Sequence, residues 1–179
     1  MIDARTQAHP GGEALTRRLL EMAVLAPCNI IDMGAGGGGT MRLLDSLGFN
    51  AAGVDVKPGE GVITGDFLHC PFPDALFDAA ICECSFFVSG DAPGAFREVA
   101  RLLRPGGKLL FSDVFFGSGE ELIRMAEDAG LRMLQMEDAT PLWREYYLSC
   151  VWAGTEKALC ACVPKGKCFY YLMIAERSR

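Results

Sequence analysis

A glycine-rich loop directly follows a short apolar run in the first quarter of the chain. Residues 29–40, NIIDMGAGGGGT, contain five glycines, and Gly34, Gly36 and Gly39 fit the spacing G-x-G-x-x-G. Glycine lets the backbone approach a ligand closely, and a helix that follows such a loop directs its N-terminus at the ligand. The loop therefore predicts a nucleotide-type binding site. A strand-to-helix connection without a ligand is the simpler alternative.

Two carboxylates near this loop narrow the chemistry of the ligand. Asp32 comes two residues before Gly34, and Asp55 ends a second apolar run 21 residues after Gly34. The carboxylate of Asp32 would repel the pyrophosphate of a dinucleotide, whereas Asp55 can accept hydrogen bonds from a ribose diol. A ligand with a ribose, no phosphate and a cationic end fits both residues, and S-adenosylmethionine is such a ligand. A nicotinamide cofactor stays open as an alternative.

The chain around these residues alternates helical and strand patterns, which is typical of an α/β sheet flanked by helices. Apolar spacing predicts a first helix from Leu15 to near Pro27 and a second from Thr40 to Gly48. A capping box at Ser118 predicts a further helix that Gly130 ends. We expect strands in the segments 51–56, 75–87, 131–138 and 167–176. Segment 95–116 is expected to form a helix, a Pro-Gly-Gly turn and a further strand, and segment 140–163 a helical insertion.

Four stretches together resemble the class I S-adenosylmethionine-dependent methyltransferases, in particular the type 11 small-molecule group. They are IIDMGAGGGG, AAGVDV, GDFLHCPFPDALFDAAICECSF and LLRPGGKLLFSDVF, and they follow the order of that family between residues 29 and 116. The resemblance implies a Rossmann-like three-layer sandwich with a seven-stranded, mostly parallel sheet in the order 3-2-1-4-5-7-6 and an antiparallel last strand. It also implies a single methyltransferase domain over residues 1–179.

The resemblance further implies which residues bind the cofactor: Asp32, Gly34, Ala35, Gly36, Asp55, Val56, Asp66, Phe67 and Glu83. Asp32 would face the amino group of the methionine part, and Asp55 would accept from the ribose hydroxyls. Val56 would pack on the adenine, Asp66 would accept from its amino group, and Phe67 would lie beside the ring. Glu83 would lie near the sulfonium.

In this fold, the acceptor pocket is commonly built by the segment after the fourth strand and by an insertion before the last strand. The insertion here is 138–166, and residues 1–12 are expected to form a flexible arm over the site. These segments give five candidate pocket residues: His9, Cys84, Trp143, Tyr147 and Cys150. The last three have helical spacing, so one helix face can carry them, with core packing as the alternative.

Methyl transfer from a sulfonium requires mainly alignment of the reactants, which can lower the activation barrier by ~7–11 kcal/mol. A general base is needed only if the nucleophile is protonated. We therefore predict no particular catalytic residue. Cys82 and Cys84 are expected on one side of a strand, and Cys160 and Cys162 follow in the insertion. We expect these cysteines to pack in the core as small hydrophobic residues. A contact with a thiol or metalloid acceptor is an alternative, because thiolates bind soft metals and metalloids. The spacing of the cysteines is poor for a zinc site.

Composition limits the classes of partner. The chain of 179 residues has a net charge of −6, which disfavours nucleic acid, and no apolar stretch reaches the ~18 residues that span a bilayer. The first residues lack the apolar core of a signal peptide, so we expect a cytoplasmic protein. The expected partner is a small-molecule methyl acceptor, and a homodimer is left open. A non-catalytic protein that binds S-adenosyl ligands as a partner subunit is a second alternative.

Overall fold

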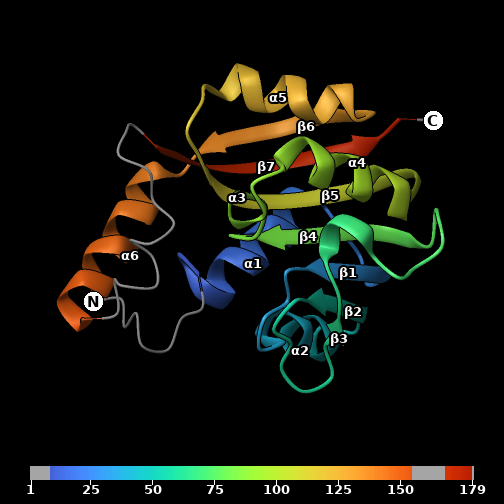
Figure 1. Ribbon diagram of the computed structural model, residues 1–179, viewed down its shortest axis with the longest axis horizontal. Helices are drawn as coiled ribbons and strands as arrows, with labels where there is room; N and C mark the ends of the chain where they lie inside the picture. Colours follow the sequence, from blue (N-terminus) through green and yellow to red (C-terminus); the bar gives the residue numbers. More distant parts are fainter. Residues whose placement is uncertain (1–8, 155–167, 179) are drawn as a thin grey trace.

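The computed structural model describes residues 9–154 and 168–178, which form one sheet with helices on both faces (Figure 1). The helices are α1 (Gly12–Met22), α2 (Gly39–Ser46), η1 (Phe67–His69), α3 (Phe86–Ser89), α4 (Ala92–Leu102), α5 (Gly119–Asp128) and α6 (Thr140–Ala153). The strands are β1 (Asn29–Met33), β2 (Asn50–Asp55), β3 (Ile63–Thr64), β4 (Phe77–Glu83), β5 (Leu103–Phe115), β6 (Leu131–Asp138) and β7 (Phe169–Arg177).

The seven strands lie in the order β3-β2-β1-β4-β5-β7-β6. The first five pair in parallel, and β7 is antiparallel to both β5 and β6. The predicted strand order and the antiparallel last strand are therefore confirmed. Because parallel strands end at one edge of a sheet, β1, β2 and β4 bring their last residues to the same side of the molecule.

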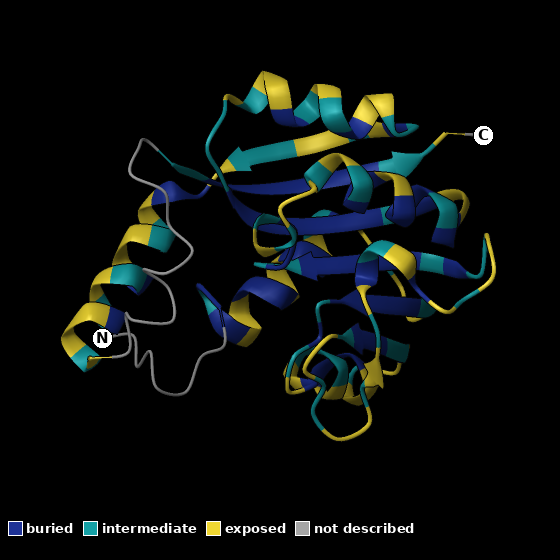
Figure 2. Ribbon diagram, in the orientation of Figure 1, coloured by how far each residue is buried: buried dark blue, intermediate teal, exposed yellow. Residues whose placement is uncertain are grey.

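Helices cover the sheet on both faces, which confirms the predicted three-layer sandwich. On one face, Leu19 of α1 and Leu44 of α2 pack with Ile30 of β1. On the other face, Phe96 of α4 and Leu122 of α5 pack in a second hydrophobic core. Figure 2 shows the central strands buried between these layers, while the outer sides of the helices are exposed. Burial on both faces holds the strand ends in fixed positions around the site.

Two local predictions were wrong. The first helix ends at Met22 and not near Pro27, because Val24 adopts a left-handed φ of 47°, which stops the helical path. The expected Pro-Gly-Gly turn lies within β5: Leu103 pairs with Phe77 and Lys108 with Ala79, so the segment between them bulges out of register. Such a bulge adds residues to one strand without ending the ladder.

Other local predictions are confirmed. Ser118 caps α5 and Glu121 closes the capping box, and Gly130, with a φ of 86°, follows the end of that helix. The insertion begins as predicted with α6 at Thr140, and its residues beyond Gly154 lie outside the described chain, as do residues 1–8 of the N-terminal arm. Among the described residues, no helix combines the length and apolar character needed to cross a membrane.

Candidate cofactor and active site

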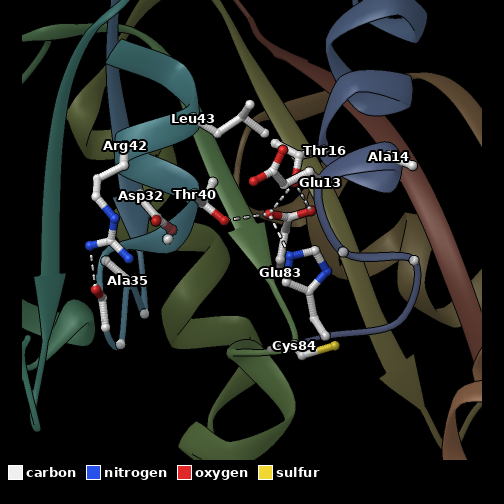
Figure 3. A pocket seen from close by; sticks show the side chains of 17 residues that line it. Glu13, Ala14, Thr16, Asp32, Ala35, Thr40, Arg42, Leu43, Glu83 and Cys84 are labelled. Atoms are coloured by element: carbon white, nitrogen blue, oxygen red, sulfur yellow. Dashed lines mark hydrogen bonds and ion pairs between the residues drawn. The ribbon is translucent and has the colours of Figure 1, made fainter. Parts of the chain in front are cut away.

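A cavity of about 770 Å³ lies at the edge of the sheet where β1 and β4 end, between the N-terminal turns of α1 and α2 (Figure 3). Its lining comes from these two helices, the glycine loop and the two strand ends: His9, Gly11, Gly12, Glu13, Ala14, Thr16, Asp32, Gly34, Ala35, Gly36, Gly37, Gly39, Thr40, Arg42, Leu43, Glu83 and Cys84. The predicted residues Asp32, Gly34, Ala35, Gly36 and Glu83 are thus brought together in one cavity.

The glycine loop is fixed to the neighbouring strand by its backbone. The N–H groups of Gly34 and Ala35 both donate to the carbonyl oxygen of Val54, at 2.9 and 3.1 Å. Gly34 has a φ of 91°, and a Cβ at this position would overlap the Cβ of Ser85. Only glycine combines this conformation with so close a neighbour. The requirement for glycine at position 34 is therefore structural as well as a matter of ligand access.

Asp32 carries the main electrostatic feature of the cavity. Asp32 is 3% exposed, and its carboxylate oxygen Oδ2 has no hydrogen-bond partner among the described residues. Burial raises the pKa of this carboxyl well above its usual range, and the charges of Glu83 and Asp55 raise it further. A buried acceptor without a partner is unfavourable. A ligand with a cationic donor, such as an ammonium group, satisfies Oδ2, so the site fits the amino-acid end of S-adenosylmethionine.

Glu83, at the end of β4, is held by donors from both helices. Its side chain is 3% exposed, and Thr16 Oγ1 lies 3.1 Å from both carboxylate oxygens while Thr40 Oγ1 lies 3.0 Å from Oε2. His9 Nε2 lies 3.5 Å from Oε2. Burial raises the pKa of Glu83, opposed by His9 and by the hydrogen bonds from Thr40 and Thr16. The carboxylate therefore ties the N-terminal helix to the glycine loop.

Thr16 and Thr40 were not predicted as site residues. Thr16 is a polar residue next to Leu15 within the buried stripe of α1, and it is 1% exposed. Thr40 follows directly after the glycine loop in the first turn of α2. A polar residue on an otherwise apolar helix stripe is the sequence signal for such a partner, because a buried hydroxyl needs an acceptor.

Asp55 lies beside the cavity rather than in its lining. Its Oδ2 accepts from the N–H of Gly36 at 2.8 Å, and its Oδ1 accepts from the N–H of Lys57 at 2.7 Å. The carboxylate thus anchors the glycine loop, and each oxygen retains a further lone pair for a ligand hydroxyl. Val56 is 66% exposed on the same side. Their roles toward the ribose and adenine stay predictions.

Asp66 and Phe67, which are expected at the adenine together with Val56, also lie outside the cavity lining. Asp66 accepts from the N–H of Leu68 at 2.9 Å and caps η1. Phe67 is 8% exposed, and its ring stacks on Phe86 in the core, with centroids 5.9 Å apart. The packing of Phe67 gives this ring a structural role, and a contact with adenine stays a prediction.

The candidate acceptor residues separate into two groups. His9 and Cys84 line the cavity. Trp143 and Tyr147 stack on one another along α6, with centroids 5.3 Å apart, and Cys150 is 2% exposed. These three residues of α6 do not belong to the cavity lining. Figure 1 shows α6 beyond the edge where the parallel strands end, so an acceptor pocket between α6 and the cavity stays a prediction.

The expectation that Cys82 and Cys84 share one side of a strand was wrong. Cys82 lies in the core beneath α4 and α5, whereas Cys84 packs against the core beneath α1. The cause is the backbone: β4 ends at Glu83, and Cys84 has a φ of 55°. Burial raises the pKa of the Cys84 thiol, so this thiol is neutral near pH 7. Cys160 and Cys162 lie outside the described residues.

Asp113 holds the segment that follows Cys84. It is 2% exposed, and its carboxylate accepts from the N–H groups of Phe87 at 3.0 Å and Val114 at 2.7 Å. Burial raises the pKa of Asp113 to about 7, with the backbone donors opposing that rise. Asp113 therefore connects β5 to the turn that carries Cys84 into the cavity.

A pH dependence of stability follows from Asp113. A carboxyl whose pKa is higher in the folded than in the unfolded protein binds its proton more tightly when folded, so stability falls as the pH rises from about 4 to about 7. One such group contributes a slope of up to about 1.4 kcal/mol per pH unit. Urea unfolding across this range should show a steeper fall for the wild type than for Asp113→Asn. Equal slopes would contradict the assignment.

Comparison with known proteins agrees with this geometry. A family profile described as a methyltransferase domain matches residues 31–111, which include the glycine loop, β2, β4 and much of β5. The chain is 34% identical over 119 residues to the malonyl-[acyl-carrier protein] O-methyltransferase of Serratia marcescens, covering 59% of this chain and 46% of that protein. The chain spans less than half the length of the first curated relatives that it matches.

Solved structures show the same fold at low sequence identity. Geranyl diphosphate C-methyltransferase from Streptomyces coelicolor, in complex with S-adenosyl-L-homocysteine, has a TM-score of 0.75 at 20% identity, covering 92% of this chain and 79% of that one. Phosphoethanolamine N-methyltransferase 2 from Haemonchus contortus, in complex with S-adenosyl-L-methionine, has a TM-score of 0.77 at 17% identity, covering 96% and 54%. The fold of this chain is therefore the Rossmann-like fold of these structures. The profile match to residues 31–111, the curated methyltransferase relatives and the solved structures together support the predicted resemblance to the class I, S-adenosylmethionine-dependent methyltransferases.

Proposed function

We propose that this protein transfers a methyl group from S-adenosylmethionine to a small-molecule acceptor. The observation that carries the proposal is the unpartnered, buried Oδ2 of Asp32 beside the glycine loop. A cationic donor satisfies this atom with a charge-assisted hydrogen bond, and the amino-acid end of S-adenosylmethionine supplies one. The methyltransferase-domain match to residues 31–111 supports the same ligand.

Each part of the site has a role in this reaction. When bound, S-adenosylmethionine would supply a methyl group on a sulfonium: the acceptor would bond to the methyl carbon as the carbon–sulfur bond breaks, with S-adenosylhomocysteine as the leaving group. Asp32 orients the ligand through its amino group, and Asp55 accepts from the ribose while holding the N–H of Gly36. Glu83 and Cys84, at the end of β4, form the wall toward the acceptor. Alignment is the main requirement of the reaction, so a dedicated base is needed only for a protonated nucleophile.

Calorimetric titration separates this proposal from its alternatives. We expect S-adenosylmethionine and S-adenosylhomocysteine to bind and NADH to give no heat of binding. Binding of NADH without S-adenosylhomocysteine would favour a nicotinamide-dependent oxidoreductase. A non-catalytic binding protein would bind the S-adenosyl ligands but form no S-adenosylhomocysteine with a panel of amine, thiol, carboxylate, carbon and arsenite acceptors. That panel also tests the thiol or metalloid alternative.

Asp55→Ala is expected to weaken binding of S-adenosylhomocysteine at least tenfold while the fold stays intact. The variant loses the acceptor for the ribose hydroxyls and frees the N–H of Gly36, which Oδ2 holds at 2.8 Å. A charge-assisted hydrogen bond contributes roughly 1.5–3 kcal/mol, which corresponds to this loss. Calorimetry measures the affinity, and circular dichroism checks the fold. Unchanged affinity would remove the ribose assignment.

A further inference from the structure

A second cavity, of about 420 Å³, lies at the carboxyl end of β5 between α3, α4 and the start of α5 (Figure 1). Among the described residues, it shares no lining residue with the cofactor cavity and takes none from α6. Its volume lies within the range of about 300–1,000 Å³ that is typical of small-molecule sites. The lining consists of apolar side chains and glycines: Phe86, Phe87, Gly90, Ala92, Pro93, Phe96, Phe111, Val114, Phe115, Phe116, Gly117 and Leu122.

The lining of this second cavity restricts the chemistry of a ligand. Phe86 is buried and contacts the rings of Phe96 and Phe111 edge-on, with centroids 5.0 and 5.4 Å apart. Phe87 and Phe116 are only partly buried and lie with their centroids 5.0 Å apart. No lining side chain carries a charge or a hydrogen-bonding group. A charged ligand would lose its hydration here without gaining a partner, whereas an aromatic or alkyl group gains burial.

Asp113 places a buried carboxylate beside the second cavity without making it a site for a cation. Its oxygens accept from the N–H groups of Phe87 at 3.0 Å and Val114 at 2.7 Å, and both of these residues line the cavity. The carboxylate therefore has donors from the protein itself, unlike Oδ2 of Asp32. The same two hydrogen bonds fix part of the cavity wall, so the cavity is formed before a ligand binds.

The two cavities lie at the ends of neighbouring strands. Glu83 of β4 pairs with Ser112 of β5, and the N–H of Cys84 donates to the carbonyl of Ser112 at 2.8 Å. Cys84 lines the cofactor cavity, and Val114, two residues beyond Ser112, lines the second cavity. Neighbouring strands are about 4.8 Å apart, and open α/β sheets bind ligands at this edge. A molecule in the second cavity can therefore extend over the end of β4 toward the cofactor.

We propose that the second cavity binds the body of the methyl acceptor and that this body is an uncharged aromatic or alkyl group. An apolar cavity of about 150 Å³ holds one benzene, so 420 Å³ has room for about two rings. The reacting atom then lies outside the cavity, over the end of β4 beside Cys84. This inference rests on the proposed function, because it assumes methyl transfer. It assigns the acceptor's body to α3, α4 and α5 and not to the expected residues of α6.

Matched acceptors with one and two rings test the assignment on the unaltered protein. The pairs are phenol and 4-phenylphenol, benzylamine and 4-phenylbenzylamine, thiophenol and biphenyl-4-thiol, and benzoate and 4-phenylbenzoate. In the class that forms S-adenosylhomocysteine, kcat/KM should be at least tenfold higher for the two-ring member, which corresponds to about 1.4 kcal/mol. A carboxylate on the distal ring should abolish this gain. No such preference in any class, with S-adenosylhomocysteine still bound in calorimetry, would overturn the inference alone. Failure to bind S-adenosylhomocysteine would instead overturn the proposed function.

A matched pair of variants tests whether the second cavity holds the distal ring. Ala92 lines this cavity at the first residue of α4, so Ala92→Trp fills it with an indole. Val88 is 61% exposed on α3 and lies outside the lining, so Val88→Trp is the control. Ala92→Trp should raise the KM of the two-ring acceptor at least tenfold and leave the Kd of S-adenosylhomocysteine unchanged, and Val88→Trp should change neither. A two-ring preference retained in Ala92→Trp would overturn the inference.

A measurement on the wild type covers the case in which Ala92→Trp does not fold. In ¹⁵N–¹H correlation spectra of the protein saturated with S-adenosylhomocysteine, 4-phenylphenol should shift the amide resonances of Gly90 and Gly117, which line the second cavity. The amide of Tyr147 on α6 should stay in place. A shift of Tyr147 without shifts of the two glycines would contradict the inference and return the acceptor to α6. The absence of any shift would contradict it as well.

Discussion

Asp32→Asn is expected to raise the dissociation constant of S-adenosylhomocysteine about 30- to 150-fold. The substitution keeps the shape of the side chain and removes the charge that receives the ligand's ammonium group. Charge-assisted hydrogen bonds contribute about 2–3 kcal/mol, and low exposure places this one at the strong end. Calorimetric titration measures the effect, and Asp128→Asn, at an exposed position on α5, is the control with the same change of charge.

The same substitution should have the opposite effect on the stability of the ligand-free protein. Burial and the charges of Glu83 and Asp55 raise the pKa of Asp32, so the wild type loses stability as the pH rises above about 4. Asp32→Asn lacks this loss, and its free energy of unfolding should exceed that of the wild type by a margin that grows with pH. A variant that weakens binding but is equally destabilised at every pH would indicate a structural role for Asp32.

Gly34→Ala is expected to lower the free energy of unfolding by about 2–5 kcal/mol. Gly34 has a φ of 91°, which costs an alanine about 1–3 kcal/mol, and its new Cβ would overlap the Cβ of Ser85. Forcing an extra methyl group into a packed site adds about 1–3 kcal/mol. Urea unfolding monitored by circular dichroism measures the loss.

Two further variants separate the causes of this effect. Gly37→Ala lies in the same loop, where an added Cβ meets no atom within 4 Å and φ is not positive, so it should change stability by less than about 0.5 kcal/mol. The double variant Gly34→Ala with Ser85→Gly removes the overlap and should recover part of the loss. If Gly34→Ala were as stable as Gly37→Ala, the close packing of the loop on Ser85 would be refuted.

The sequence predicted the parts of the fold that depend on local pattern. Apolar runs and the capping box at Ser118 define most elements, and the order of the strands followed from the resemblance of four motifs. β3 is different: it has two residues, Ile63 and Thr64, both exposed, and so short a strand has no periodicity. The left-handed conformations of Val24 and Cys84 could not be predicted from the sequence either, because valine and cysteine rarely adopt a positive φ.

The residues of the candidate site also fall into a group that the sequence predicts and a group that only the folded structure shows. Asp32, the glycine loop and Asp55 could be found because carboxylates beside a glycine-rich turn have a chemical meaning in the sequence itself. The hydroxyls of Thr16 and Thr40 on Glu83 could not, because they depend on how α1 packs over the sheet, 67 and 43 residues from Glu83.

The most direct test of the account is a crystal structure of the protein with S-adenosylhomocysteine. The account predicts that the ligand's amino nitrogen lies within about 3.2 Å of Asp32 Oδ2 and that its ribose hydroxyls lie at Asp55. A complex in which Oδ2 of Asp32 remains without a donor, or a crystal grown with NADH in which a pyrophosphate fills the glycine loop, would contradict it.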